Sequence, residues 1–131
     1  MKINDKKLFF TSLITLIILI ILDTVFKIKS FYYFYPNIDI IMHFIGGFSI
    51  TTLSIAILHR LRMANSLNIV LMIFFVSIFW EYLEFIVGRN IYVNISFWID
   101  TLVDLLMDAL GGIMAYICFY KIPLRKKNLQ K

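Results

Sequence analysis

The chain has 131 residues, of which 61% are hydrophobic and 16% are charged, and its mean hydropathy is +0.87. These values exclude an ordinary soluble globular protein and predict a membrane protein with one domain, residues 1–131. The formal net charge is +5. We interpret the basic tail at 121–131 as a topology signal and a contact with anionic lipid, and we expect no nucleic-acid partner.

Four apolar runs are long enough to cross about 30 Å of hydrocarbon. They cover residues 8–26, 36–58, 67–88 and 101–120. The first run also resembles a signal peptide, but no small-x-small cleavage site follows it, so we predict a retained helix. The predicted fold class is therefore all-α: a polytopic membrane protein with four transmembrane helices in a small bundle.

The basic residues predict how the chain is oriented in the membrane. Ten of the 13 lysines and arginines lie before the first run, between the second and third runs, or after the fourth. Those after the fourth run form a basic tail at 121–131. Because such residues accumulate in cytoplasmic segments, we expect both termini on the cytoplasmic side of a bacterial-type cytoplasmic membrane. The aromatic segment FYYFYP at 31–36 then belongs to the outer interfacial belt.

Two stretches of the chain repeat one another. Residues 39–47 read DIIMHFIGG and residues 104–112 read DLLMDALGG. Each begins with an acid, has a second polar group four residues later and ends in two glycines, so all four positions fall on one stripe of a helix. The match predicts two parallel helix-hairpin repeats related by an axis along the membrane normal, although it is clear only in the second and fourth runs.

The predicted topology brings the polar residues of three helices to one depth, in the outer half of the membrane. An uncompensated charge at mid-membrane costs about 2.5–3.5 kcal/mol, so these groups must face the bundle interior. Carboxylates with one imidazole inside a helical bundle are a donor set for a divalent metal ion, and this set does not select one metal. The predicted ligands are Asp39, His43, Asp104 and Asp108, and the predicted catalytic bases are Glu81 and Glu84. The competing interpretation is a set of hydrogen-bonded polar groups that hold the helices together.

The glycines lie one to two turns deeper on the same stripe. They are Gly46 and Gly47 in the first copy and Gly111 and Gly112 in the second. Since small residues let membrane helices approach closely, we predict that the second and fourth runs pack together there. The bundle would then open outward into a vestibule lined by the acids.

The order D-x-x-x-H, E-x-x-E, D-T-x-x-D and G-G over residues 36–116 resembles the YjdF-like family of small bacterial membrane proteins. It is similar, more distantly, to the VanZ-like family. The VanZ-like pattern has a lysine where this chain has Ile40, and amides where it has Glu84 and Asp108. These departures make the site more acidic than the VanZ-like pattern implies. Neither resemblance implies a settled activity.

Three classes of function fit these residues. One is an enzyme that acts on a lipid or lipid-linked envelope substrate from the outer leaflet, with a cation or a carboxylate activating water. Another is a cation or proton transporter that uses the same acids; its four-helix protomer would have to oligomerise or rearrange to conduct. The third is a non-catalytic envelope component. The chain has no HExxH, GxSxG or Gly-rich phosphate loop, which argues against zincin, serine-hydrolase and nucleotide chemistry.

Overall fold

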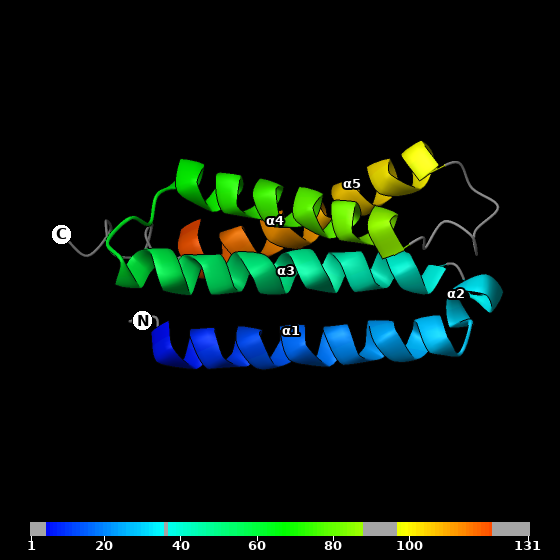
Figure 1. Cartoon of the computed structure of the whole chain (residues 1–131). Coiled ribbons are helices and arrows are strands. Elements are labelled where there is room, and N and C mark those ends of the chain that lie inside the picture. The colour runs from blue at the N-terminus through cyan, green and yellow to red at the C-terminus, as the bar shows by residue number, and fades with distance from the viewer. Residues whose placement is uncertain (1–4, 36, 88–96, 122–131) are drawn as a thin grey trace.

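The computed structural model describes residues 5–35, 37–87 and 97–121, and almost all of them are helical. The four long helices are α1 (Asp5–Ile28), α3 (Asn37–Arg60), α4 (Ser66–Val87) and α5 (Phe97–Tyr116). A short helix α2 (Phe31–Phe34) joins α1 to α3, and a π-helical segment η2 (Ile117–Lys121) continues α5. The long helices lie side by side in one bundle (Figure 1).

Each long helix is long and apolar enough to cross a membrane. The predicted fold class, an all-α bundle with four transmembrane helices, is therefore confirmed. Helix α2 was not predicted from the sequence; it lies within the aromatic segment that we assigned to the membrane interface. Residues 88–96 and all of the basic tail after Lys121 lie outside the described residues, and the repeat relation between the two hairpins stays a prediction.

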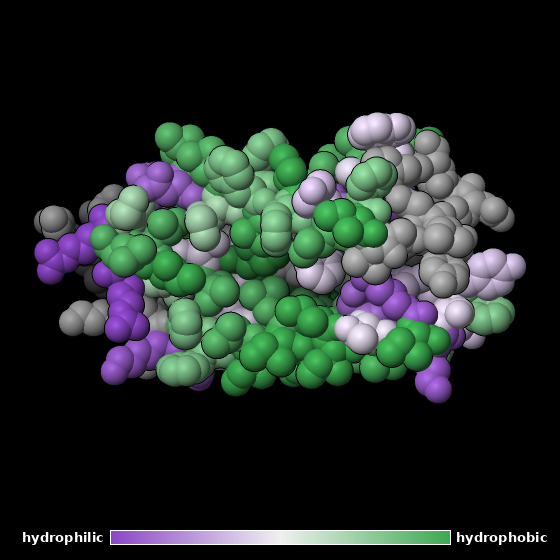
Figure 2. All heavy atoms as spheres, in the orientation of Figure 1, coloured by the Kyte–Doolittle hydropathy of each residue, from purple (hydrophilic) through white to green (hydrophobic). Residues whose placement is uncertain are grey.

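The distribution of polar and apolar side chains is that of a protein surrounded by lipid. Large apolar side chains cover the surface (Figure 2), as at Ile21 and Phe75, which are 57% and 66% exposed. The buried residues, by contrast, are mostly polar: Ser12, Asp23, Asp39, His43, Ser49, Thr51, Thr52, Ser54, Ser77, Glu81, Glu84, Asp104 and Asp108. Water outside the bundle would favour the opposite arrangement, so this surface fits a bilayer.

Helix α3 occupies the centre of the bundle and packs against α1, α4 and α5. Helices α3 and α5 run in the same direction, and α1 and α4 run in the other (Figure 1). We call the end at which α2 lies the α2 end; α1 and α4 finish there and α3 and α5 begin there. At the opposite end an apolar cluster of Ile55, Leu58 and Ile69 forms the core.

The turn between α3 and α4 fixes their antiparallel packing. Arg62 has a left-handed backbone conformation, with φ 59°. Its N–H donates to the carbonyl of His59 at 3.1 Å, and the N–H of Met63 donates to the carbonyl of Leu58 at 2.8 Å. This is the bond pattern of a Schellman cap, which ends a helix by satisfying its last carbonyls. It returns the chain toward the α2 end, where α4 delivers its two glutamates.

Candidate metal centre

The six polar residues predicted to share one site are all buried, and all lie toward the α2 end of the bundle. Helix α3 contributes Asp39 and His43 from its first two turns, α4 contributes Glu81 and Glu84 from its last two, and α5 contributes Asp104 and Asp108. Their shared depth follows from the helix directions, because two helices begin and one ends at this level. The i, i+4 and i, i+3 spacings then keep each pair on one face of its helix.

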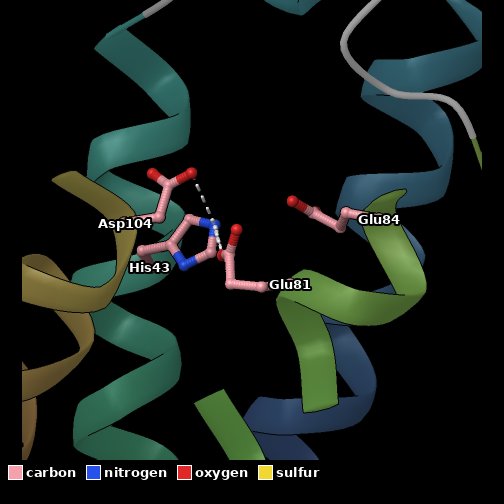
Figure 3. Close-up of side chains that lie close together, drawn as sticks. All are labelled: His43, Glu81, Glu84 and Asp104. Carbon is pink, nitrogen blue, oxygen red and sulfur yellow. Dashed lines mark ion pairs between the residues drawn. The ribbon is translucent and has the colours of Figure 1, made fainter. Parts of the chain in front are cut away.

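His43 lies at the centre of this cluster (Figure 3). Its Nε2 atom is 3.7 Å from Asp39 Oδ1, 3.7 Å from Asp104 Oδ2 and 3.9 Å from Glu81 Oε1. Each distance is too long for a hydrogen bond. Three carboxylates from three helices therefore surround one imidazole nitrogen without forming a hydrogen bond to it.

The other ring nitrogen of His43 has a different partner. Nδ1 lies 3.4 Å from Asp108 Oδ1. A carboxylate at the second nitrogen is a common way to fix the tautomer and direction of a metal-binding histidine. This geometry favours Asp108 as the residue that orients His43, whereas the sequence analysis assigned Asp108 as a ligand.

Four of the cluster residues offer atoms that one ion could bind together. One ligand atom each from His43, Glu81, Glu84 and Asp104 lies within 4.8 Å of the others, and all four residues are buried. Figure 3 shows these side chains directed toward one another from α3, α4 and α5. Ligand atoms around an octahedral ion with bonds of about 2.1 Å lie about 3 Å apart, so small side-chain movements would let these four atoms fill four of its six positions. This arrangement favours Glu81 and Glu84 as ligands beside their predicted role as bases.

A second group of potential ligands shares one residue with the first. Asp39, Asp100 and Asp104 also offer atoms within 4.8 Å of one another. Asp104 belongs to both groups, so its carboxylate could bridge a close pair of cations. Asp100, which is only partly exposed, was not assigned to the site by the sequence analysis.

The buried oxygen Oε1 of Glu81 lies within this cluster. Among the residues that the structure describes, Oε1 of Glu81 accepts no hydrogen bond although it is buried. Leaving a buried carboxylate oxygen unsatisfied costs more than about 1–3 kcal/mol. A cation between this atom and His43 would supply the missing interaction.

A lysine that was not predicted to belong to the site lies at the edge of the cluster. Lys27, in the last turn of α1, has its Nζ 2.7 Å from Asp23 Oδ2 and 3.7 Å from Glu84 Oε1. Trp80 donates its indole N–H to the same Glu84 oxygen at 3.0 Å, and Tyr32 donates its hydroxyl to Asp23 Oδ1 at 2.7 Å. The i, i+4 spacing of Asp23 and Lys27 was a usable signal for the pair, but the sequence does not show that it faces α4.

The glycines have different surroundings in the folded protein. A Cβ on Gly47 would overlap the backbone of Asp108, and one on Gly111 would overlap the backbone of Phe44. Gly112 faces the side chains of Thr51 and Ile73. At Gly47 and Gly111, therefore, the backbones of α3 and α5 lie close together. Gly46 instead lines a cavity, and its nearest neighbour would be an Asp108 carboxylate oxygen at 3.9 Å.

Together, the fold and the cluster define a four-helix membrane protein with a buried carboxylate–histidine site. A family described as "Predicted membrane protein (DUF2238)" matches residues 4–125, and the chain belongs to this family. No curated protein and no solved structure matches the chain. The family description supports the membrane class and gives no activity, and the narrower YjdF-like and VanZ-like resemblances stay predictions.

Proposed function

We propose that this protein binds a divalent cation within the membrane, through His43, Glu81, Glu84 and Asp104. The observation that carries the proposal is the convergence of four buried ligand atoms from three helices. The unsatisfied oxygen of Glu81 gives independent support. Asp39 and Asp100 extend the donor set toward a second ion that would share Asp104.

The balance of charge supports a bound cation. Six carboxylates are buried at the α2 end: Asp23, Asp39, Glu81, Glu84, Asp104 and Asp108. Lys27 would balance one of them, and His43 must be neutral to bind a metal ion, which leaves five negative charges uncompensated. Buried charges in a membrane must be paired, protonated or neutralised by an ion. A divalent cation reduces the excess without requiring that most of the carboxylates be protonated.

Metal content and thermal unfolding test this proposal. The protein, purified in lipid nanodiscs, should contain a divalent metal by elemental analysis, and a chelator should lower its melting temperature. A ligand present at about 100 times its Kd stabilises the folded state by about 2.7 kcal/mol, so the shift should be several degrees. It should be smaller at acid pH, because protons compete with the metal for the carboxylates and the imidazole.

Conservative variants separate a metal site from hydrogen-bonded packing. Glu81→Gln, Asp104→Asn and His43→Ala should each reduce the response to chelator, whereas Asp5→Asn, at the start of α1 and the far end of the bundle, should retain it. Amides hydrogen-bond as well as protonated acids do, so a packing role predicts that the two amide variants unfold like the wild type. Metal-free wild-type protein with an unchanged melting temperature in chelator would reject the cation site.

The reaction that such a centre would support is hydrolysis or transfer on a lipid or lipid-linked envelope substrate. A cation in a dry cavity polarises an oxygen of its substrate and lowers the pKa of bound water. Glu81 and Glu84 lie close enough to the site to act as bases if the ion leaves one of them free. Turnover of a labelled lipid extract by the wild type, lost in the Asp104→Asn variant, tests this step.

The orientation of the chain is part of the same proposal. If both termini are cytoplasmic, the α2 end and the cation site face the outer leaflet. Reporter fusions at residue 131 and in the 88–96 segment should report opposite sides of the membrane. An external reporter at residue 131 would move the site to the inner leaflet without removing it.

A further inference from the structure

A cavity of about 240 Å³ extends from the cation cluster toward the opposite end of the bundle. One part of its wall is apolar and includes Leu16, Leu19 and Ile20 of α1, with Ile50 of α3 and Val76 of α4. The other part carries polar groups, among them Asp39, His43, Glu84 and Asp108. The cavity is therefore amphipathic, and its polar end is the edge of the cation site.

The cavity lies where two helices do not pack together. Over the described residues, α1 packs on α3 and α2, and α4 packs on α3 and α5, but α1 and α4 make hardly any direct contact. Figure 2 shows this face of the bundle, where a hydrophilic patch interrupts the apolar surface toward the α2 end. Lys27 links the two helices there through Glu84, and its side chain is 26% exposed. A molecule in the bilayer could thus reach the cavity between α1 and α4.

We propose that the cavity binds one alkyl chain of a membrane amphiphile whose phosphate head contacts the bound cation. The volume decides how much of the ligand is held. Pockets that enclose a whole drug-sized ligand have volumes of about 300–1,000 Å³, and this cavity is smaller. It fits the head-proximal part of one chain, and the rest of the ligand would remain in the surrounding lipid.

The choice of a phosphate head depends on the proposed function. Divalent cations such as Mg²⁺ are commonly held by one or two carboxylates together with phosphate oxygens of a substrate. Lys27 adds a second positive charge, 2.7 Å from Asp23 and 3.7 Å from Glu84, and both of these acids line the same cavity. Phosphate oxygens can bind the cation and can also accept a hydrogen bond from the Lys27 ammonium. An amine head would instead pair with the carboxylates directly and would compete with the cation.

The two tryptophans of the chain allow a direct test of occupancy. Trp80 lines the cavity, whereas Trp98 is 75% exposed on α5, and the sequence holds no other tryptophan. The Trp98→Phe variant therefore reports quenching at the cavity, and Trp80→Phe reports quenching by probe dissolved in the bilayer. The probes are 3-bromododecyl phosphate and 3-bromododecyl trimethylammonium, which carry their bromine close to the head, added to protein in phosphatidylcholine nanodiscs with Mn²⁺, Mg²⁺ or Zn²⁺ or with chelator.

The phosphate probe should quench Trp80 with saturation near one molecule per protein. Chelation should weaken this binding at least tenfold. Quenching of Trp98 should rise in proportion to the probe in the bilayer and show no saturation. Quenching of Trp80 that only parallels that of Trp98 would overturn the cavity site. Tighter binding of the ammonium probe than of the phosphate probe, or binding unaffected by chelator, would overturn the phosphate assignment.

Cavity-filling variants provide the matched controls. Leu19→Phe, with Trp98→Phe, places a larger side chain in the cavity and should abolish the saturable component. Ile21→Phe makes a similar change on the lipid-facing side of the same helix, where Ile21 is 57% exposed, and should leave it intact. Loss of the saturable quenching in both variants, or in neither, contradicts the assignment of the alkyl chain to this cavity.

The melting temperature with and without chelator, measured on the same samples before probe is added, separates the two proposals. A retained cation response without saturable quenching rejects only the amphiphile site. A missing cation response rejects the proposed function and, with it, the phosphate head. Saturable quenching that survives in that case would still assign an alkyl chain to the cavity.

Discussion

The two ends of the bundle bury polar groups in different ways. At the opposite end, the hydroxyls of Thr51, Thr52 and Ser54 each donate to the carbonyl four residues earlier in α3. At the α2 end, polar side chains reach across helices, as His43 does toward Glu81 and Asp104. Hydroxyls bonded to their own helix need no partner elsewhere and no ion. Carboxylates that face one another across helices do need something between them, so the α2 end is the candidate site among the residues that the structure describes.

The contrast also bears on transport. A proton or cation path through the bundle would need polar groups beyond the cluster that can exchange partners. Thr51, Thr52 and Ser54 are buried along α3, but their hydroxyl protons are committed to backbone carbonyls of the same helix. These three hydroxyls therefore provide no step in such a path.

Between the two ends lies the glycine contact, and breaking it should have the largest effect. In Gly111→Ala the new Cβ would overlap the backbone carbonyl of Phe44, which cannot move as a flexible side chain does. Overpacking costs about 1–3 kcal/mol and sometimes more, so we expect lost or strongly reduced folded protein in size-exclusion and thermal-unfolding experiments.

Gly46→Ala is the matched control for that change. It makes the same substitution in an α-helix, but its Cβ would lie 3.9 Å from the nearest side-chain atom, which is an ordinary contact. Alanine favours a helix over glycine by about 1 kcal/mol, so this variant should unfold at or above the wild-type temperature. Equal loss of stability in both variants would contradict the assigned contact.

The next largest effect should be on cation affinity. Its size should distinguish a ligand, Asp104, from the residue that orients His43, Asp108. Asp104 belongs to both groups of ligand atoms, so Asp104→Asn should weaken cation binding by more than a hundredfold. Asp108 contacts His43 through Nδ1, and loss of such a partner costs about 10–100-fold in metal affinity. Titration with Mn²⁺ followed by melting temperature measures both. A larger effect in Asp108→Asn would restore the role that the sequence predicted for Asp108.

Lys27→Met should change the cation response in the opposite direction. The variant removes a positive charge 3.7 Å from Glu84 and keeps an unbranched apolar side chain in its place. Since like charges compete for the same carboxylate, cation affinity should rise severalfold while the helix pair α1 and α4 loses its link. Lys29→Met, on an exposed residue beyond the end of α1, is the control and should leave cation affinity unchanged.

The sequence could predict the depth and spacing of the site because both depend on distances along single helices. Asp39 with His43, and Asp104 with Asp108, are one turn apart whatever surrounds them. The sequence could not predict how each helix is rotated about its axis. That rotation decides that Gly47, not Gly46, meets α5, that Asp108 faces Nδ1, and that Lys27 faces Glu84. It arises from packing among several helices, which a repeat pattern in two of them does not determine.

The smallest expected effects lie among the buried hydroxyls, and their signs differ. Ser54→Ala removes a hydroxyl that donates to the carbonyl of Ile50 at 2.8 Å. That carbonyl keeps its bond from the helix, so the loss of stability should be at most about 0.5–1.5 kcal/mol.

Ser77 is also buried, but its Oγ has no hydrogen-bond partner among the residues that the structure describes. Ser77→Ala removes an unsatisfied group and should leave the melting temperature unchanged or raise it. Neither variant should alter the response to chelator, because both hydroxyls lie outside the two groups of ligand atoms. A lower melting temperature and a lost cation response in Ser77→Ala would extend the site beyond the α2 end.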